Sequence, residues 1–141
     1  MISSDRMTHQ LSVARTLVEQ ARSQSSYSEG ELQDLFVLGY LHDIGYEFAA
    51  DPDKHAPAGG EVLKRLGFVY WAEVANHGNP ASTYSSAELD LLNSADMHTS
   101  STGDRITYAE RLQDIADRYG EDSPRYQNAR TIIADLERKG L

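Results

Sequence analysis

The sequence predicts an all-α fold, and three observations lead to that prediction. Every long segment with regularly spaced apolar residues has the helical period of about 3.6 residues. No segment of convincing length alternates apolar and polar residues in the way that a half-buried strand does. Ser28, Ser85 and Thr107 each stand three residues before a Glu, a spacing typical of the capping box that opens a helix. We therefore expect a single-domain helical bundle of about six or seven helices.

The first three expected helices follow from apolar stripes and from residues that favour helix ends. Residues 7–22 and 28–43 both carry apolar residues at helical spacing. A third helix starts near Pro57, which suits a first turn, and it ends at Gly67. Its Gly59-Gly60 pair is unfavourable by about 1 kcal/mol per Gly. The pair indicates either a weak helix start or close packing against a neighbouring helix or a ligand.

The second half of the chain continues the same pattern. Four further helices are expected at residues 68–76, 86–98, 107–119 and 124–139. The apolar residues of the first of these, Val69 among them, are expected to be mostly buried. The sequence contains no repeat, no low-complexity tract and no internal linker long enough to divide it. One domain is therefore expected over residues 1–141, with a core at about 7–119 and a C-terminal helix at about 124–139.

The composition narrows the class of protein. A hydrophobic fraction of 40% and a charged fraction of 25% are ordinary for a soluble domain. No apolar run approaches the roughly 20 residues that cross a bilayer, and the first residues lack the apolar core of a signal peptide. A cytoplasmic location is the default expectation. The net charge of −9 argues against a polymeric nucleic acid as partner. Because there is no cysteine, any metal must be held by His, Asp or Glu.

The most informative segment is Leu41-His42-Asp43-Ile44-Gly45. By angular count, His42 and Asp43 fall on the same helix face as the apolar residues that precede them. An unpaired carboxylate in such a place costs several kcal/mol, so the pair needs partners. A metal ion would satisfy both groups, and a hydrogen-bonded helix end is the alternative. Gly45 is expected to end the helix by adopting a positive φ. Asp96 is a second carboxylate on an apolar stripe, in the helix at 86–98.

Other candidate residues carry weaker signals. His9 lies at the edge of the first apolar stripe, His55 precedes the third helix, and His77 stands at a helix end before a Gly. Each of these histidines could instead cap a helix, complement its dipole or line a pocket. Lys54 and Arg105 could reach a phosphate, although a surface charge is the alternative reading of both. His98 points away from the ligand face, and the charges at 104–119 are interpreted as a solvated helix face or a subunit contact.

The order His9, His42-Asp43, Asp96 resembles the HD superfamily of metal-dependent phosphohydrolases. The signature of that superfamily is a His, a His-Asp doublet and a distant Asp, all on helices of one bundle. The segments around His42-Asp43 and around Ser94-Ala95-Asp96-Met97 are similar to its two central motifs. The resemblance implies that His9, His42, Asp43 and Asp96 surround one metal ion. It further implies that His55 and His77 serve a second ion, with Asp43 as the bridge; their alternative role is to contact substrate phosphate.

The resemblance also implies a function. The expected activity is that of a metal-dependent phosphohydrolase, which cleaves a phosphoester or phosphoanhydride of a small metabolite, a nucleotide among the candidates, through a metal-bound hydroxide. His42 and Asp43 are the expected catalytic residues, Lys54 and Arg105 the expected substrate contacts. The cofactor is one or two divalent ions of Fe, Mn, Co, Ni or Zn. Two alternatives remain: an HD-type diiron oxygenase and a non-catalytic HD-fold module that senses a ligand. The expected partner is a small phosphorylated metabolite, and no association with a membrane is expected. The oligomeric state stays open.

Overall fold

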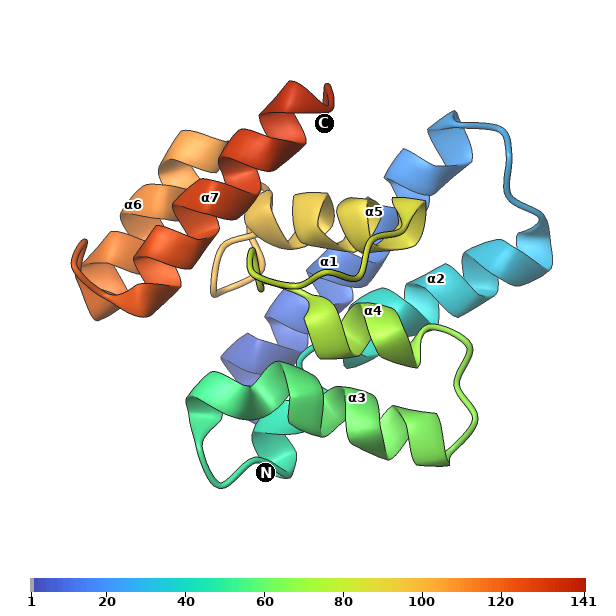
Figure 1. Ribbon diagram of the computed structural model, residues 1–141. Coiled ribbons are helices and arrows are strands. Elements are labelled where there is room, and N and C mark those ends of the chain that lie inside the picture. Colours follow the sequence, from blue (N-terminus) through green and yellow to red (C-terminus); the bar gives the residue numbers. More distant parts are fainter. Residues whose placement is uncertain (1) are drawn as a thin grey trace.

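The computed structural model describes residues 2–141, and over those residues it contains seven α-helices, two short 3₁₀ helices and no strand (Figure 1). In chain order the elements are α1 (Ser4–Ser23), α2 (Glu29–Leu41), η1 (Ile44–Glu47), η2 (Pro52–Lys54), α3 (His55–Arg65), α4 (Trp71–Asn76), α5 (Ala87–Met97), α6 (Tyr108–Tyr119) and α7 (Pro124–Arg138). The all-α prediction is confirmed. The capping boxes at Ser28 and Thr107 are also present.

The main core lies where α1 packs against α2 and α5. Fully buried leucines and valines from these helices and from α3 and α4 fill it: Val13, Leu17, Leu35, Leu38, Leu63, Val74, Leu91 and Leu92. The helices α1 and α2 approach closely, because a Cβ on Gly39 would lie 2.5 Å from the Cα of Ala14. This close crossing brings the N-terminal half of α1 beside the end of α2.

The C-terminal hairpin of α6 and α7 has a second, smaller core. It contains Ile115 from α6, Ile132, Ile133 and Leu136 from α7, and Met97 from the end of α5. Figure 1 shows the hairpin on one side of the molecule, with α3 and α4 packed together on the other. Contacts between α5 and α7 attach the hairpin to the rest of the bundle. Among the described residues, no helix combines the length and apolar character needed to cross a bilayer.

The end of α2 differs from the sequence prediction. The helix ends at Leu41, so His42 is its C-cap residue and Asp43 lies outside it, although the prediction extended the helix through both. Gly45 does not adopt the positive φ that was expected. The reason for the glycine is close approach, because a Cβ there would overlap the carbonyl oxygen of His55 and lie 2.7 Å from the backbone nitrogen of Gly59. The missing side chain lets η1 pack directly on the start of α3.

The segment between α3 and α4 also departs from the prediction. The helix expected at 68–76 begins only at Trp71, because Gly67 (φ 78°) ends α3 in a Schellman motif. In that motif the Phe68 backbone N–H donates to Leu63 O at 3.0 Å, so Phe68 belongs to the cap of α3. Val69 is 60% exposed, and the expectation that it is buried was wrong.

Two smaller features of the prediction are settled by the structure. The start of α5 is capped by Ser86, whose Oγ accepts from the Leu89 N–H, rather than by a capping box at Ser85. The Gly59-Gly60 pair reflects close packing rather than a weak helix start. A Cβ on Gly60 would overlap the side chain of Ala75 and lie 2.7 Å from its Cα. The pair therefore allows α3 and α4 to lie against each other.

We predict that Gly60→Ala destabilises the protein although alanine is the better helix former. The added methyl group meets the backbone of α4, and overpacking of this kind costs about 1–3 kcal/mol. Urea unfolding of the variant and the parent measures the difference. Gly30→Ala is the matched control: the nearest atom to its Cβ is Ser28 Oγ at 3.9 Å, so we expect no loss of stability. Equal stabilities of Gly60→Ala and its parent would contradict the packing argument.

Candidate metal centre

Four buried side chains from distant parts of the chain meet at one point inside the bundle. His9 comes from α1, His42 and Asp43 follow α2, and Asp96 comes from the last turn of α5. The His9 Nε2 atom lies 3.0 Å from Asp96 Oδ1 and 3.7 Å from Asp43 Oδ2. The His42 Nε2 atom lies 3.2 Å from Asp43 Oδ2 and 3.7 Å from Asp96 Oδ1. The ligand atoms of His9, His42 and Asp43 are close enough together to share a metal ion.

A second group of ligands lies on the other side of Asp43. His55 is the first residue of α3 and His77 is the C-cap residue of α4. Their Nε2 atoms lie 3.3 Å and 3.2 Å from Asp43 Oδ1, and 3.3 Å from each other. Asp43, His55 and His77 are therefore also close enough to hold an ion. One oxygen of Asp43 faces the first group and the other oxygen faces the second, which is the arrangement of a bridging carboxylate.

The backbone fixes the orientation of all four imidazoles. In each ring the Nδ1 atom lies within hydrogen-bond distance of a backbone carbonyl, which can only accept. The pairs are His9 with Ser100 O (2.8 Å), His42 with Gly39 O (2.7 Å), His55 with Pro52 O (2.9 Å) and His77 with Val74 O (2.6 Å). Nδ1 therefore carries the proton in every ring, and Nε2 is left as a free ligand atom. Histidines that bind metals are commonly held in this way.

The donor atoms fit a cation better than they fit one another. With Nδ1 protonated, the Nε2 atoms of His55 and His77 present two lone pairs to each other at 3.3 Å. His42 Nε2 is buried and has no hydrogen-bond partner among the described residues. Imidazole nitrogens combined with carboxylate oxygens, without thiolate, suit Fe, Mn, Co, Ni or Zn. The arrangement of the described residues could thus hold a divalent transition metal ion, and it does not favour one of these elements over the others.

The charges of the buried groups depend strongly on each other. Burial disfavours the charged form of His42, but Asp43 and Asp96 outweigh that effect and raise its pKa well above the ordinary value. Burial also disfavours the ionised form of Asp43, yet the charge of His42 and the polar contacts with the His55 and His77 rings hold its pKa well below normal. The pKa of Asp96 is likewise lowered against the effect of burial, chiefly by His42 and His9 and also by Arg111. Both carboxylates are therefore ionised at neutral pH.

The two groups open into a cavity of about 750 Å³ between the bundle and the C-terminal hairpin. His9, Asp43, His55, His77 and Asp96 all line it, whereas His42 is completely buried behind them. The opposite wall is formed by residues of α6 and α7: Arg111, Ile115, Arg118, Tyr119, Pro124, Arg125, Asn128 and Ala129. A small molecule in this cavity can thus reach the ligand groups.

The arginines of this cavity were not predicted as site residues from the sequence. Arg6, Arg111, Arg118 and Arg125 all line it, in a chain with a net charge of −9. Arg111 is only 12% exposed, donates to Asp114 Oδ2 at 3.0 Å and lies 3.5 Å from Asp96 Oδ1. Its interpretation as a solvated or subunit-contact charge was wrong. A signal was present, because Arg111, Ile115 and Arg118 follow one another at the spacing of a single helix face.

The structure does not bring Lys54 or Arg105 to the cavity. The Arg105 guanidinium donates to Thr16 Oγ1 at 2.9 Å and to the Glu19 carboxylate on α1, and it is not among the cavity residues. Lys54 is exposed in η2 and also lies outside the lining. Both side chains lie in short segments outside the α-helices, where helical periodicity does not predict the direction of a side chain. His98 lies away from the ligand groups as expected, with Nδ1 donating to Ser94 O at 2.9 Å.

The fold and the site together define an all-α protein with a buried His/Asp centre at the bottom of a cavity. A family model described as HD domain matches residues 6–122. The chain therefore belongs to the HD domain family, the HD superfamily of metal-dependent phosphohydrolases. No curated protein and no solved structure matches the chain. The matched region ends before α7, so the part of the cavity wall that α7 contributes lies outside it.

We predict that substitutions of the two ligand groups change the metal content by different amounts. Parent protein should hold about two ions per chain, one for each group, and His77→Ala should lose only one of them. Asp43→Ala should lose most of both, because its two oxygens face both groups. Elemental analysis after metal loading and desalting measures the content. His98→Ala, a histidine outside the cluster, is the control, and equal losses in all three variants would contradict the assignment of two groups.

We also predict opposite pH dependences with and without metal. Because the pKa of His42 in the folded protein lies above its unfolded value of about 6.5, metal-free protein gains full stabilisation from this group below that pH. That stabilisation is lost as the pH rises through the folded pKa. Protons compete with metal ions for Nε2, so stabilisation by added metal should grow over the same range. Thermal unfolding in chelator and in excess Mn²⁺ measures both trends, and parallel curves would argue against a metal at His42.

Proposed function

We propose that the protein is a metal-dependent phosphohydrolase that cleaves a phosphoester or phosphoanhydride of a small metabolite. The observation that carries this proposal is the position of Asp43. Its two oxygens face two histidine groups at the bottom of a cavity. Pairs of metal ions held by shared ligands are typical of enzymes that displace groups at phosphorus. Membership of the HD domain family supports the same class of reaction.

The cavity favours a small anionic substrate. A volume of about 750 Å³ lies within the range of about 300–1,000 Å³ that is common for sites of small ligands. Arginine is well suited to phosphate, because its planar guanidinium donates two parallel hydrogen bonds to phosphate oxygens. Four arginines line the cavity, and Arg118, which lies over the ring of Tyr119, forms no ion pair with a carboxylate of residues 2–141. A nucleotide has the size and the charge that this cavity can accept.

The proposed roles follow from the position of each side chain. His9, His42, Asp43 and Asp96 would hold one ion, and Asp43, His55 and His77 would hold the other. Bound divalent ions supply positive charge to a phosphoryl group and lower the pKa of water. Arg111 holds Asp96 in place through its own charge and lines the cavity beside it, where it can stabilise charge that develops on phosphate oxygens. His42 has no access to the cavity, so its catalytic role is that of a ligand.

The proposed function predicts phosphate release from a panel of nucleotides and phosphate esters when Mn²⁺, Fe²⁺, Co²⁺ or Ni²⁺ is supplied. Chelator should abolish the release, and Asp43→Ala should reduce it to background. Iron-dependent oxygen consumption without phosphate release would instead favour the diiron oxygenase. Tight binding of a phosphorylated metabolite by metal-loaded protein, without any turnover, would favour the sensing module.

The same assay decides which arginine contacts the substrate. Arg111→Gln should lower kcat/KM by about 100-fold, the usual effect of removing one charged donor from the transition state. Arg105→Gln is the matched control, because its ion pair with Glu19 is on the surface and contributes little. Metal content measured on both variants separates loss of substrate binding from loss of metal. A larger effect of Arg105→Gln would restore the role that the sequence suggested for it.

A further inference from the structure

The ring of Tyr46, in η1, lies between the ring of the candidate ligand His55 and the guanidinium of Arg6. On one face it stacks on His55, with ring centroids 4.0 Å apart and an interplanar angle of 10°. On the other face lies the Arg6 guanidinium, with its Cζ 3.6 Å from the ring centroid. Stacked rings and cation–π contacts of this kind restrict both partners to a narrow range of orientations. Three elements, α1, η1 and α3, are joined by this column.

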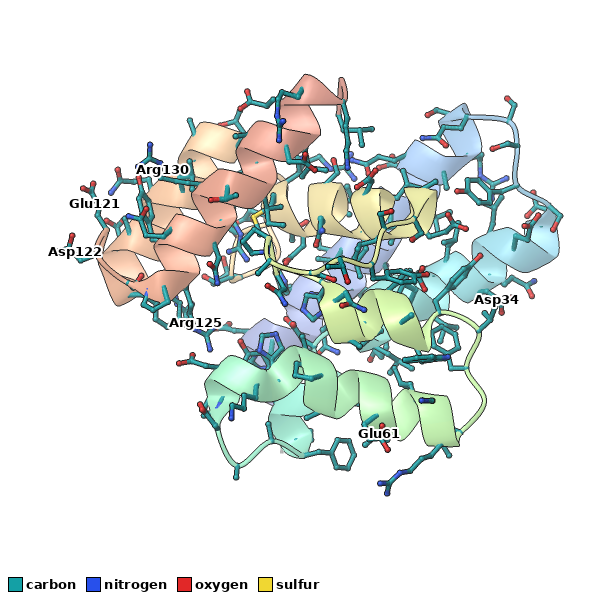
Figure 2. The ribbon with its side chains drawn as sticks, viewed as in Figure 1. Asp34, Glu61, Glu121, Asp122, Arg125 and Arg130 are labelled. Atoms are coloured by element: carbon teal, nitrogen blue, oxygen red, sulfur yellow. The ribbon has the colours of Figure 1, made fainter. Side chains whose placement is uncertain are left out.

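The hydroxyl end of Tyr46 is held from the C-terminal helix. Arg125, at the start of α7, donates from Nη1 to the Tyr46 hydroxyl at 2.8 Å. The same guanidinium pairs with Asp53 in η2 at 3.2 Å and lies over the ring of Tyr119 at 4.7 Å. Figure 2 shows Arg125 at the end of α7 that approaches α3, whereas Arg130 lies farther along the helix, away from α3. Arg125 therefore connects α7 to the loops that surround His55.

His55 is the imidazole that most needs such support. Its side chain is 17% exposed, compared with 6%, 0% and 3% for His9, His42 and His77. Burial fixes the orientation of the other three rings, but it leaves one side of His55 open to the cavity. A single hydrogen bond from Nδ1 to Pro52 O allows the ring to tilt about that bond. The stack with Tyr46 fixes the plane of the ring, and with it the direction of Nε2 toward Asp43 and His77.

We infer that Tyr46 is a positioning residue for His55 and that Arg125 anchors it, so that the second metal group depends on α7. This inference rests on the proposed function, because it requires an ion at Asp43, His55 and His77. It is selective: the ring contacts of Tyr46 reach His55, and no ring contact joins Tyr46 to His9 or His42 among residues 2–141. Arg6, the other partner of the Tyr46 ring, lies 4.0 Å from Asp43 Oδ2, so loss of the stack on His55 should weaken the ion at Asp43, His55 and His77 more than the other ion.

Calorimetric titration of metal-free protein with Mn²⁺ tests the inference, because it measures a binding constant for each of the two sites. Tyr46→Leu removes the stack and should weaken the site that His77→Ala abolishes by about 10-fold or more, as is usual when a supporting contact of a ligand is lost. Tyr46→Phe keeps the stack and loses the hydroxyl, so it and Arg125→Gln should each have a smaller effect of about threefold. The site that His77→Ala retains should be affected less in all three variants.

A second measurement does not depend on metal. In ¹H–¹⁵N correlation spectra of metal-free parent protein, His55 should show one tautomer with the proton on Nδ1, because Pro52 O accepts it. In Tyr46→Leu the His55 ring should exchange between its two tautomers, while His9 and His77 should each keep a single tautomer. A purely structural role of Tyr46 would disturb all the histidines together. Tyr46→Phe should retain the parent spectrum, and Arg125→Gln keeps the inference testable if Tyr46→Leu fails to fold.

Two controls match the variants. Arg130→Gln removes an exposed arginine from the same helix, and Tyr40→Leu removes a ring that stacks on Phe36 with centroids 6.4 Å apart. Both should bind two ions as the parent does. Unchanged binding constants and an unchanged His55 spectrum in Tyr46→Leu would overturn the inference and leave the proposed function intact. Binding of a single ion by the parent would also overturn it, whereas binding of none would defeat the proposed function itself.

Discussion

The structure depends on the electrostatic environment of one buried carboxylate, that of Asp43. Four imidazole nitrogens and a second carboxylate surround it, and the protein supplies these groups from α1, the end of α2, and helices α3 to α5. Buried charges are tolerated only when they are paired or bind a cation. The six groups present more lone pairs than protons to fill them, so a bound cation would stabilise this interior.

Convergence of so many polar side chains requires unusually close packing of the backbone around them. Gly39 allows α2 to cross α1, and Gly45 allows η1 to lie on the start of α3. The same close packing places backbone carbonyls opposite the Nδ1 atoms, so the tautomer of each imidazole is set by the main chain. The geometry of the candidate metal centre is therefore a property of how the helices pack.

The C-terminal hairpin supplies what the bundle lacks. The bundle carries the ligand groups, which are rich in negative charge, and α6 and α7 contribute three of the four cavity arginines. Arg111 pairs with Asp96, and Arg125 reaches across to Tyr46 and Asp53. These contacts join the two parts of the molecule at the cavity itself. A helix outside the region matched by the family model thus takes part in shaping the candidate site.

The sequence by itself determined the all-α fold, most helix bounds, and the residues that needed an explanation. His42, Asp43 and Asp96 were recognisable because polar groups on apolar stripes are rare, a property of local periodicity. Only the tertiary structure decided which charges reach the cavity. Lys54 and Arg105 lie in segments that local patterns do not orient, and both lie outside it, whereas Arg111 lines it because the α6–α7 hairpin packs against the rest of the bundle. The C-terminal end of α2 and the reason for a glycine at position 45 were likewise decided by packing against α3. Close approach between segments that are distant in the sequence leaves no local signal, so neither could be predicted from the sequence.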